Sequence, residues 1–153
     1  METKVRRTQD NLFIMGTSVI VFGLWDLIKF TVYFFVNSDE IKQASGEKYF
    51  MLSVIVVWTI FFVSFLLRCF IGFSARAEGK GKRKSILYLI CAGMIALVYF
   101  SIIVFEVSYF ITDQENIITA IVTLIIDITS LVFLVELIVN SIKIRKLRKD
   151  VSE

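Results

Sequence analysis

The chain contains no histidine and no proline. Without histidine it lacks the commonest metal ligand and the usual general base near neutral pH. Without proline, nothing in the sequence forces a kink in a long helix, although many transporters build their sites around broken helices. The two cysteines, Cys69 and Cys91, form no CxxC motif, so no disulfide framework is indicated. With no nucleophile–base pair and no metal-ligand set, we predict that the protein is not an enzyme and carries no cofactor or metal.

Charge is also scarce, and apolar residues dominate. The 153 residues are 57% hydrophobic and only 20% charged, with 15 phenylalanines. Ordinary soluble domains are about 45–50% apolar, and exposed apolar surface costs roughly 25 cal/mol per Å² in water. A lipid bilayer removes that cost. The composition therefore predicts an integral membrane protein.

Four apolar stretches organise the sequence. They are residues 12–36, 49–73, 86–111 and 117–142. A hydrocarbon core of ~30 Å needs about 20 helical residues, so each stretch is long enough to span it. Barrel strands would be shorter and would alternate in polarity. Short polar connections favour antiparallel neighbours. We therefore predict an all-α fold, a four-helix up-down transmembrane bundle in which residues 1–153 form a single transmembrane domain.

The distribution of lysine and arginine predicts the orientation. Thirteen of them lie in the N-terminal tail, the second connection (residues 74–85) and the C-terminal tail, whereas the opposite side has only Lys42 and Lys48. Cytoplasmic segments of membrane proteins carry the excess of these residues. The predicted protein is thus a multi-pass protein of the cell membrane with both termini in the cytoplasm (N-in/C-in).

The same basic segments suggest partners. Each lysine or arginine near an anionic leaflet contributes about 1 kcal/mol of attraction, so the second connection and the C-terminal tail are expected to contact anionic lipid headgroups. A simpler interpretation is that they only set the topology. No nucleic-acid-binding fold is indicated. Four helices enclose little space, which favours a homo-oligomer if the protein forms a pathway.

Ionisable residues inside the apolar stretches are the strongest functional signal, because such residues are costly in lipid and usually have a role. They are Asp26, Lys29, Arg68, Glu106, Asp127 and Glu136, four acids against two bases. Arg68 and Glu136 share a level near the inner interface and form a candidate inner charge pair, unless Arg68 extends to the headgroups. Asp26 and Lys29 are three residues apart on one helix and are expected to neutralise each other.

Asp127 is the least easily explained of the six. It falls near the membrane midplane, where a lone charge costs on the order of 3 kcal/mol. Thr119, Thr123 and Asp127 recur every four residues and Ser130 follows, so one polar stripe runs along one helix face. The stripe serves either interhelical hydrogen bonding or a hydrophilic path. Asp26 lies within about one turn of the same depth, so the two acids could share a proton or a cation.

Two functional hypotheses follow. The first is a proton- or cation-coupled transporter or ion pathway built on Asp127, Asp26, Lys29 and Thr123. The second is a non-catalytic membrane scaffold or accessory subunit of a larger complex. Small residues indicate close helix packing in either case, with Gly16 and Gly23 on one face of the first stretch and Gly93 beside Ala92 and Ala96 in the third.

Overall fold

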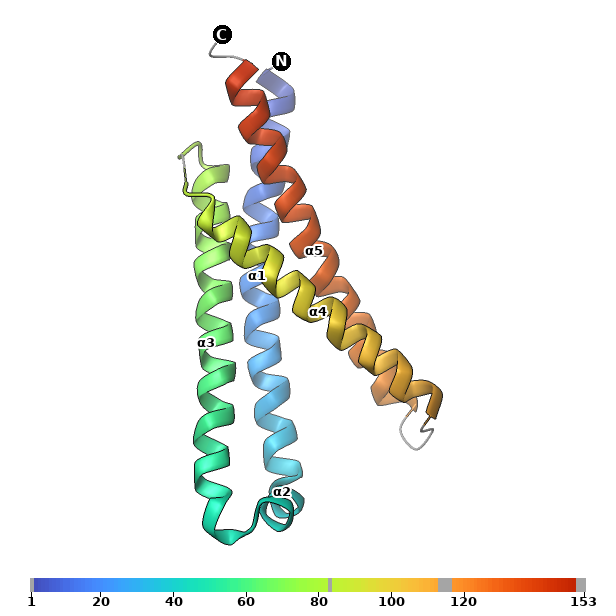
Figure 1. The fold of residues 1–153 in the computed structure, drawn as a ribbon. Coiled ribbons are helices and arrows are strands. Elements are labelled where there is room, and N and C mark those ends of the chain that lie inside the picture. The colour runs from blue at the N-terminus through green and yellow to red at the C-terminus, as the bar shows by residue number, and fades with distance from the viewer. Residues whose placement is uncertain (1, 83, 113–116, 151–153) are drawn as a thin grey trace.

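The described residues of the computed structural model, 2–82, 84–112 and 117–150, form helices and short turns, with no strand among them. The helices are α1 (Glu2–Val36), α2 (Ser38–Ser45), α3 (Glu47–Gly79), α4 (Leu87–Thr112) and α5 (Ile117–Asp150) (Figure 1). All except α2 are long and apolar enough to cross a membrane. The predicted all-helical class is confirmed, as is the presence of four long apolar helices that are candidates for membrane spans.

The first connection contains a helix that the sequence reasoning missed. Within the short polar connection between the first two apolar stretches, Ser38–Ser45 form the helix α2. Gly46 then takes a φ of 73°, a left-handed conformation that glycine adopts without steric cost, and the chain turns there into α3. Asn37 and Gly46 therefore flank a short helix.

Helices α1 and α3 pack against each other along most of their length. Near the middle of the contact their backbones nearly touch, because a Cβ atom placed on Gly72 would lie 2.5 Å from the carbonyl oxygen of Gly16. Toward α2 the contact is aromatic, with the rings of Phe30 and Phe61 stacked at 3.8 Å and Trp58 edge-on to Phe30. The two helices form one closely packed unit, which we call the α1–α3 hairpin.

Helices α4 and α5 form a second antiparallel unit, the α4–α5 hairpin, which crosses the first and diverges from it toward the end that carries α2 (Figure 1). We call that end the α2 end, and the opposite end, where α1 begins and α5 finishes, the terminal end. The buried apolar core has members from all four long helices. They are Leu12, Val19, Ile71, Ala75, Tyr88, Cys91, Ala92, Tyr99, Leu134, Leu137 and Ile144. By chain direction, every one of them lies at or on the terminal side of the level of Asp26.

The terminal end extends further than the sequence predicted. Helix α1 begins at Glu2 rather than near residue 12, and α5 continues to Asp150 rather than ending near residue 142. The polar segments remain helical because they bury side chains where α1 and α5 lie side by side (Figure 1). Thr8, Leu12 and Ile144 are all buried in this region. Packing against a neighbouring helix thus extends both helices beyond the apolar stretches.

Candidate functional site

Five of the six ionisable residues found in the apolar stretches gather at one level of the structure, where the two hairpins part. We call this group, together with Tyr99, the charge cluster. Its members are Asp26 and Lys29 on α1, Arg68 on α3, Tyr99 and Glu106 on α4, and Asp127 on α5. All four long helices therefore contribute a polar side chain to the same place.

The first half of the charge cluster is centred on Asp26. Arg68 Nη2 lies 2.6 Å from Asp26 Oδ2, and the hydroxyl of Tyr99 donates a hydrogen bond to the same oxygen. The guanidinium of Arg68 also lies over the Tyr99 ring, 4.6 Å from its centroid. The Arg68 side chain is only 3% exposed. A buried cation is thus held by a carboxylate and an aromatic face, the two groups that best compensate its lost hydration.

The candidate pair of Arg68 with Glu136 is wrong. Arg68 binds Asp26, and Glu136 is exposed on α5. Glu136 is nine residues from Asp127 and so lies on the opposite face of its helix, away from the charge cluster. Gly23 explains the observed partner, since a Cβ atom there would lie 2.8 Å from Arg68 Cδ. The missing side chain lets Arg68 lie flat against α1 and reach Asp26.

The second half of the charge cluster joins the two hairpins. Lys29 Nζ on α1 lies 3.6 Å from Asp127 Oδ2 on α5. The Asp127 side chain is 5% exposed, whereas that of Lys29 is 40% exposed. Asp26 and Lys29, which were expected to neutralise each other on one helix, each also make an ion pair with a different helix. Asp127 is therefore buried, which fits either interpretation of its polar stripe.

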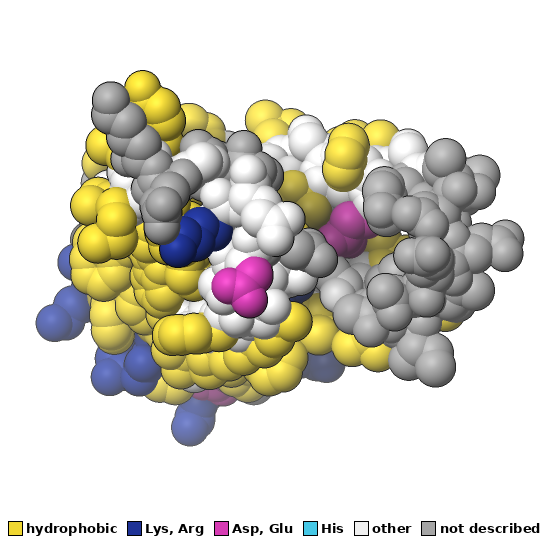
Figure 2. Space-filling model, turned by 90° about the horizontal axis from the view of Figure 1, so that it is seen from below, with side chains coloured by type: hydrophobic (Ala, Val, Ile, Leu, Met, Phe, Trp, Pro, Cys, Tyr) yellow, Lys and Arg dark blue, Asp and Glu magenta, His cyan; other side chains and the backbone are white. Residues whose placement is uncertain are grey.

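Glu106 gives the charge cluster one more carboxylate than it has cations. It comes from α4 and adjoins both Asp127 and Lys29. Its Oε2 atom is buried and has no hydrogen-bond partner among the described residues. Three carboxylates, those of Asp26, Glu106 and Asp127, thus face two cations, Lys29 and Arg68. Figure 2, seen from the α2 end, shows an acidic side chain between the two parts of the molecule.

The structure describes part of the polar stripe on α5. Thr123 is half-buried one turn before Asp127, and Ser130 is buried three residues after it. Their spacing places both on the Asp127 face of α5. The side chain of Thr119 lies outside the described residues. The stripe therefore runs from the charge cluster along the inward face of α5.

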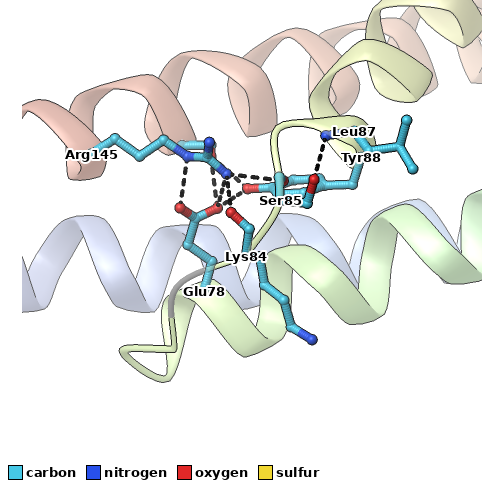
Figure 3. Close-up of polar contacts among 7 residues, drawn as sticks. Glu78, Lys84, Ser85, Leu87, Tyr88 and Arg145 are labelled. Atoms are coloured by element: carbon cyan, nitrogen blue, oxygen red, sulfur yellow. Dashed lines mark hydrogen bonds and ion pairs between the residues drawn. The ribbon is translucent and has the colours of Figure 1, made fainter.

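A second polar network lies near the terminal end and was not foreseen. We call it the terminal-end network, and it consists of Glu78 on α3, Tyr88 on α4, and Ser141 and Arg145 on α5 (Figure 3). Glu78 is 1% exposed. It accepts hydrogen bonds from the Tyr88 hydroxyl, from Ser141 Oγ at 3.0 Å and from Arg145 Nε at 2.8 Å. The network therefore links three helices through one buried carboxylate.

Arg145 also fixes the connection between α3 and α4. Its Nη2 donates to the carbonyl oxygens of Lys84 at 3.1 Å and Ser85 at 3.2 Å (Figure 3). The sequence reasoning missed this network because Glu78 and Arg145 lie outside the predicted apolar stretches. One usable signal was present: Tyr88 and Tyr99 are eleven residues apart, three helical turns, so both hydroxyls belong to one face of α4.

Comparisons of the chain with protein-family models, with curated proteins and with solved structures find no match. Among the described residues, no three histidine, cysteine, aspartate or glutamate side chains are grouped as metal ligands. What the site offers chemically is two ion pairs and one surplus carboxylate inside a membrane-spanning region.

Proposed function

We propose that the protein is a small membrane transporter or ion pathway in which the charge cluster takes up a proton or a monovalent cation. The observation that carries the proposal is the contact of Glu106 and Asp127, two adjoining carboxylates that share the single cation Lys29. In a region of low dielectric constant, an unbalanced charge is costly, and a proton or a cation relieves it. Reversible neutralisation of this kind is what ion-coupled transport requires.

The position of the charge cluster supports the proposal. On its terminal side lies the apolar core shared by all four long helices. On its α2 side the hairpins diverge (Figure 1), and an acidic side chain is visible between them (Figure 2). A site accessible from one side and closed on the other is the arrangement expected of one state of a transporter.

The proposal includes a topology and a location. The protein would be an up-down helical bundle in the cell membrane with the terminal end in the cytoplasm, because thirteen lysines and arginines accompany the terminal end and its connection, against two at the α2 end. The exposed Lys80, Lys82 and Lys146 would meet anionic headgroups there. A homo-oligomer would enlarge the space available for a pathway.

A non-catalytic scaffold or accessory subunit is the second candidate, and one observation favours it. Asp26 and Asp127 each have a cationic partner from another helix. Interhelical ion pairs of this kind hold a bundle together without moving anything. In that case the surplus carboxylate of Glu106 would have no role in transport.

Flux measurements in liposomes distinguish the two. The wild-type protein is expected to carry protons, Na⁺ or K⁺ across an imposed gradient. A pH-sensitive dye inside the vesicles measures proton flux, and ion-sensitive dyes measure Na⁺ and K⁺ flux. Asp127→Asn and Glu106→Gln keep the side-chain shape but cannot ionise, and each is expected to reduce the flux at least tenfold. Glu136→Gln is the matched control, because Glu136 is exposed on α5 outside the charge cluster, and it should transport normally.

Two results would count against the transport proposal. One is a folded wild-type protein, shown by its helical circular dichroism, that moves none of these ions. The other is an Asp127→Asn, Glu106→Gln double variant with undiminished flux, which would place any pathway elsewhere.

A further inference from the structure

We infer that the α4–α5 hairpin swings as a unit on the α1–α3 hairpin, with the terminal-end network as its pivot, and that this motion opens and closes the charge cluster at the α2 end. The inference rests on packing and polar contacts, so it does not depend on which ion crosses, or on whether any ion does.

The α1–α3 hairpin has the properties of a rigid unit. Gly16 and Gly72 bring the two backbones into contact, and a Cβ atom on Gly79 would lie 2.8 Å from the carbonyl oxygen of Gln9. Toward the α2 end, Phe30, Trp58 and Phe61 continue the contact. Because the packing extends from one end to the other, this hairpin has no half that can move separately.

The terminal-end network has the properties of a pivot. Its hydrogen bonds radiate from one buried atom group, the carboxylate of Glu78, to α4 and α5 (Figure 3). Tyr88 and Ser141 lie 2.5 Å apart, hydroxyl to hydroxyl, so α4 and α5 are tied to each other at the same point. With the apolar core shared by the four long helices, these contacts join the hairpins in their terminal half. An interface joined in one half can change its angle in the other, which is how hinged proteins move.

Toward the α2 end, the contact between the two hairpins has few buried apolar residues, unlike the contact toward the terminal end. Beyond the level of Asp26, no residue of the buried apolar core is found among the described residues. The ties that remain are polar and few. They are the hydrogen bond from Tyr99 to Asp26, the guanidinium of Arg68 over the Tyr99 ring, and the contacts of Lys29 with Asp127 and Glu106. These contacts therefore set how far the hairpins part.

Distances between spin labels test the motion. In a background with Cys69→Ser and Cys91→Ser, one pair of labels is placed at the α2 end, at Phe35→Cys on α1 and Ile121→Cys on α5. A matched pair is placed at the terminal end, at Asp10→Cys and Lys146→Cys on the same two helices. All four positions are exposed. The full chain is measured in lipid nanodiscs by pulsed electron paramagnetic resonance.

The α2-end pair is expected to give a broad or two-component distance distribution, and the terminal-end pair a narrow one. Tyr99→Phe removes one tie, so it should shift the α2-end distribution to longer distances by about 5 Å, roughly one helical turn, and leave the terminal-end pair unchanged. Tyr88→Phe weakens the pivot and should broaden the terminal-end distribution.

The inference is overturned if the α2-end distribution is as narrow as the terminal-end one and does not respond to Tyr99→Phe. It is also overturned if Tyr99→Phe moves both pairs equally, because the hairpins would then separate without a pivot. A narrow terminal-end distribution in a folded Tyr88→Phe protein would show that the network is not the pivot. If Tyr88→Phe does not fold, the comparison of the two pairs in Tyr99→Phe decides the question.

Discussion

Arg68 shows why charged residues in a membrane helix need a partner at the right angle as well as at the right depth. Depth was predicted by counting residues along each helix. It put Asp26 and Asp127 near one level, but it put Arg68 near the inner interface, away from the Asp26 that it contacts. The angle depends on which helices are neighbours, and nothing in the sequence states that α1 and α3 are joined through Gly16 and Gly72. Burial of Asp127 could be predicted from its polar stripe, but the partner of Arg68 could not.

A double-mutant cycle checks the partner of Arg68. Removing the charges with Arg68→Gln and Asp26→Asn should give a coupling free energy of about 1–3 kcal/mol in unfolding experiments in detergent, because the two groups are in contact. The parallel cycle of Arg68→Gln with Glu136→Gln should give a coupling within about 0.5 kcal/mol of zero. If the second cycle shows the larger coupling, the pair inferred from depth alone exists after all.

At the scale of elements, two glycines in apolar helices have very different surroundings. Gly72 lies in a contact so close that a methyl group has no room, whereas a Cβ atom on Gly93 of α4 would have nothing within 4 Å. Gly93 stands beside Ala92 in an apolar helix, so the sequence predicted a packing role for Gly93. The prediction was wrong for Gly93 because a small residue permits close packing but does not require it.

Substitution by alanine should separate these two glycines clearly. Gly72→Ala inserts a methyl group against the backbone of α1 and is expected to lower the free energy of unfolding by about 1–3 kcal/mol. Gly93→Ala adds a methyl group in open space and improves helix propensity, so stability should stay equal or rise by up to about 1 kcal/mol. Thermal unfolding followed by circular dichroism compares them. Equal losses in both variants would contradict the close α1–α3 contact.

At the scale of the whole molecule, the sequence predicted the class and the number of spanning helices but not their arrangement. Apolar stretches of sufficient length can be recognised in a linear sequence, because each spanning helix must by itself be long and apolar enough to cross the hydrocarbon core. The placement of the two hairpins depends on contacts between residues far apart in the chain, such as Glu78 with Arg145. Those contacts involve residues at the ends of the apolar stretches, where hydrophobicity carries no information about partners.

The orientation in the membrane is testable with single cysteines in the cysteine-free background. An impermeant maleimide added to intact cells should label Asp39→Cys in α2, whereas Lys82→Cys in the connection between α3 and α4 should react only after the membrane is permeabilised. Both positions are exposed, so reactivity reports sidedness. The reverse pattern would place the terminal end outside, contrary to the charge distribution.

The divergence of the two hairpins also gives the molecule a wedge shape, since its cross-section is larger at the α2 end than where the hairpins cross (Figure 1). A wedge displaces more lipid from one leaflet than from the other, and it fits best in a bilayer that bends to match. If the hairpins swing as inferred, the taper of the wedge changes with their angle. Membrane curvature and lipid shape would then act directly on the exposure of the charge cluster.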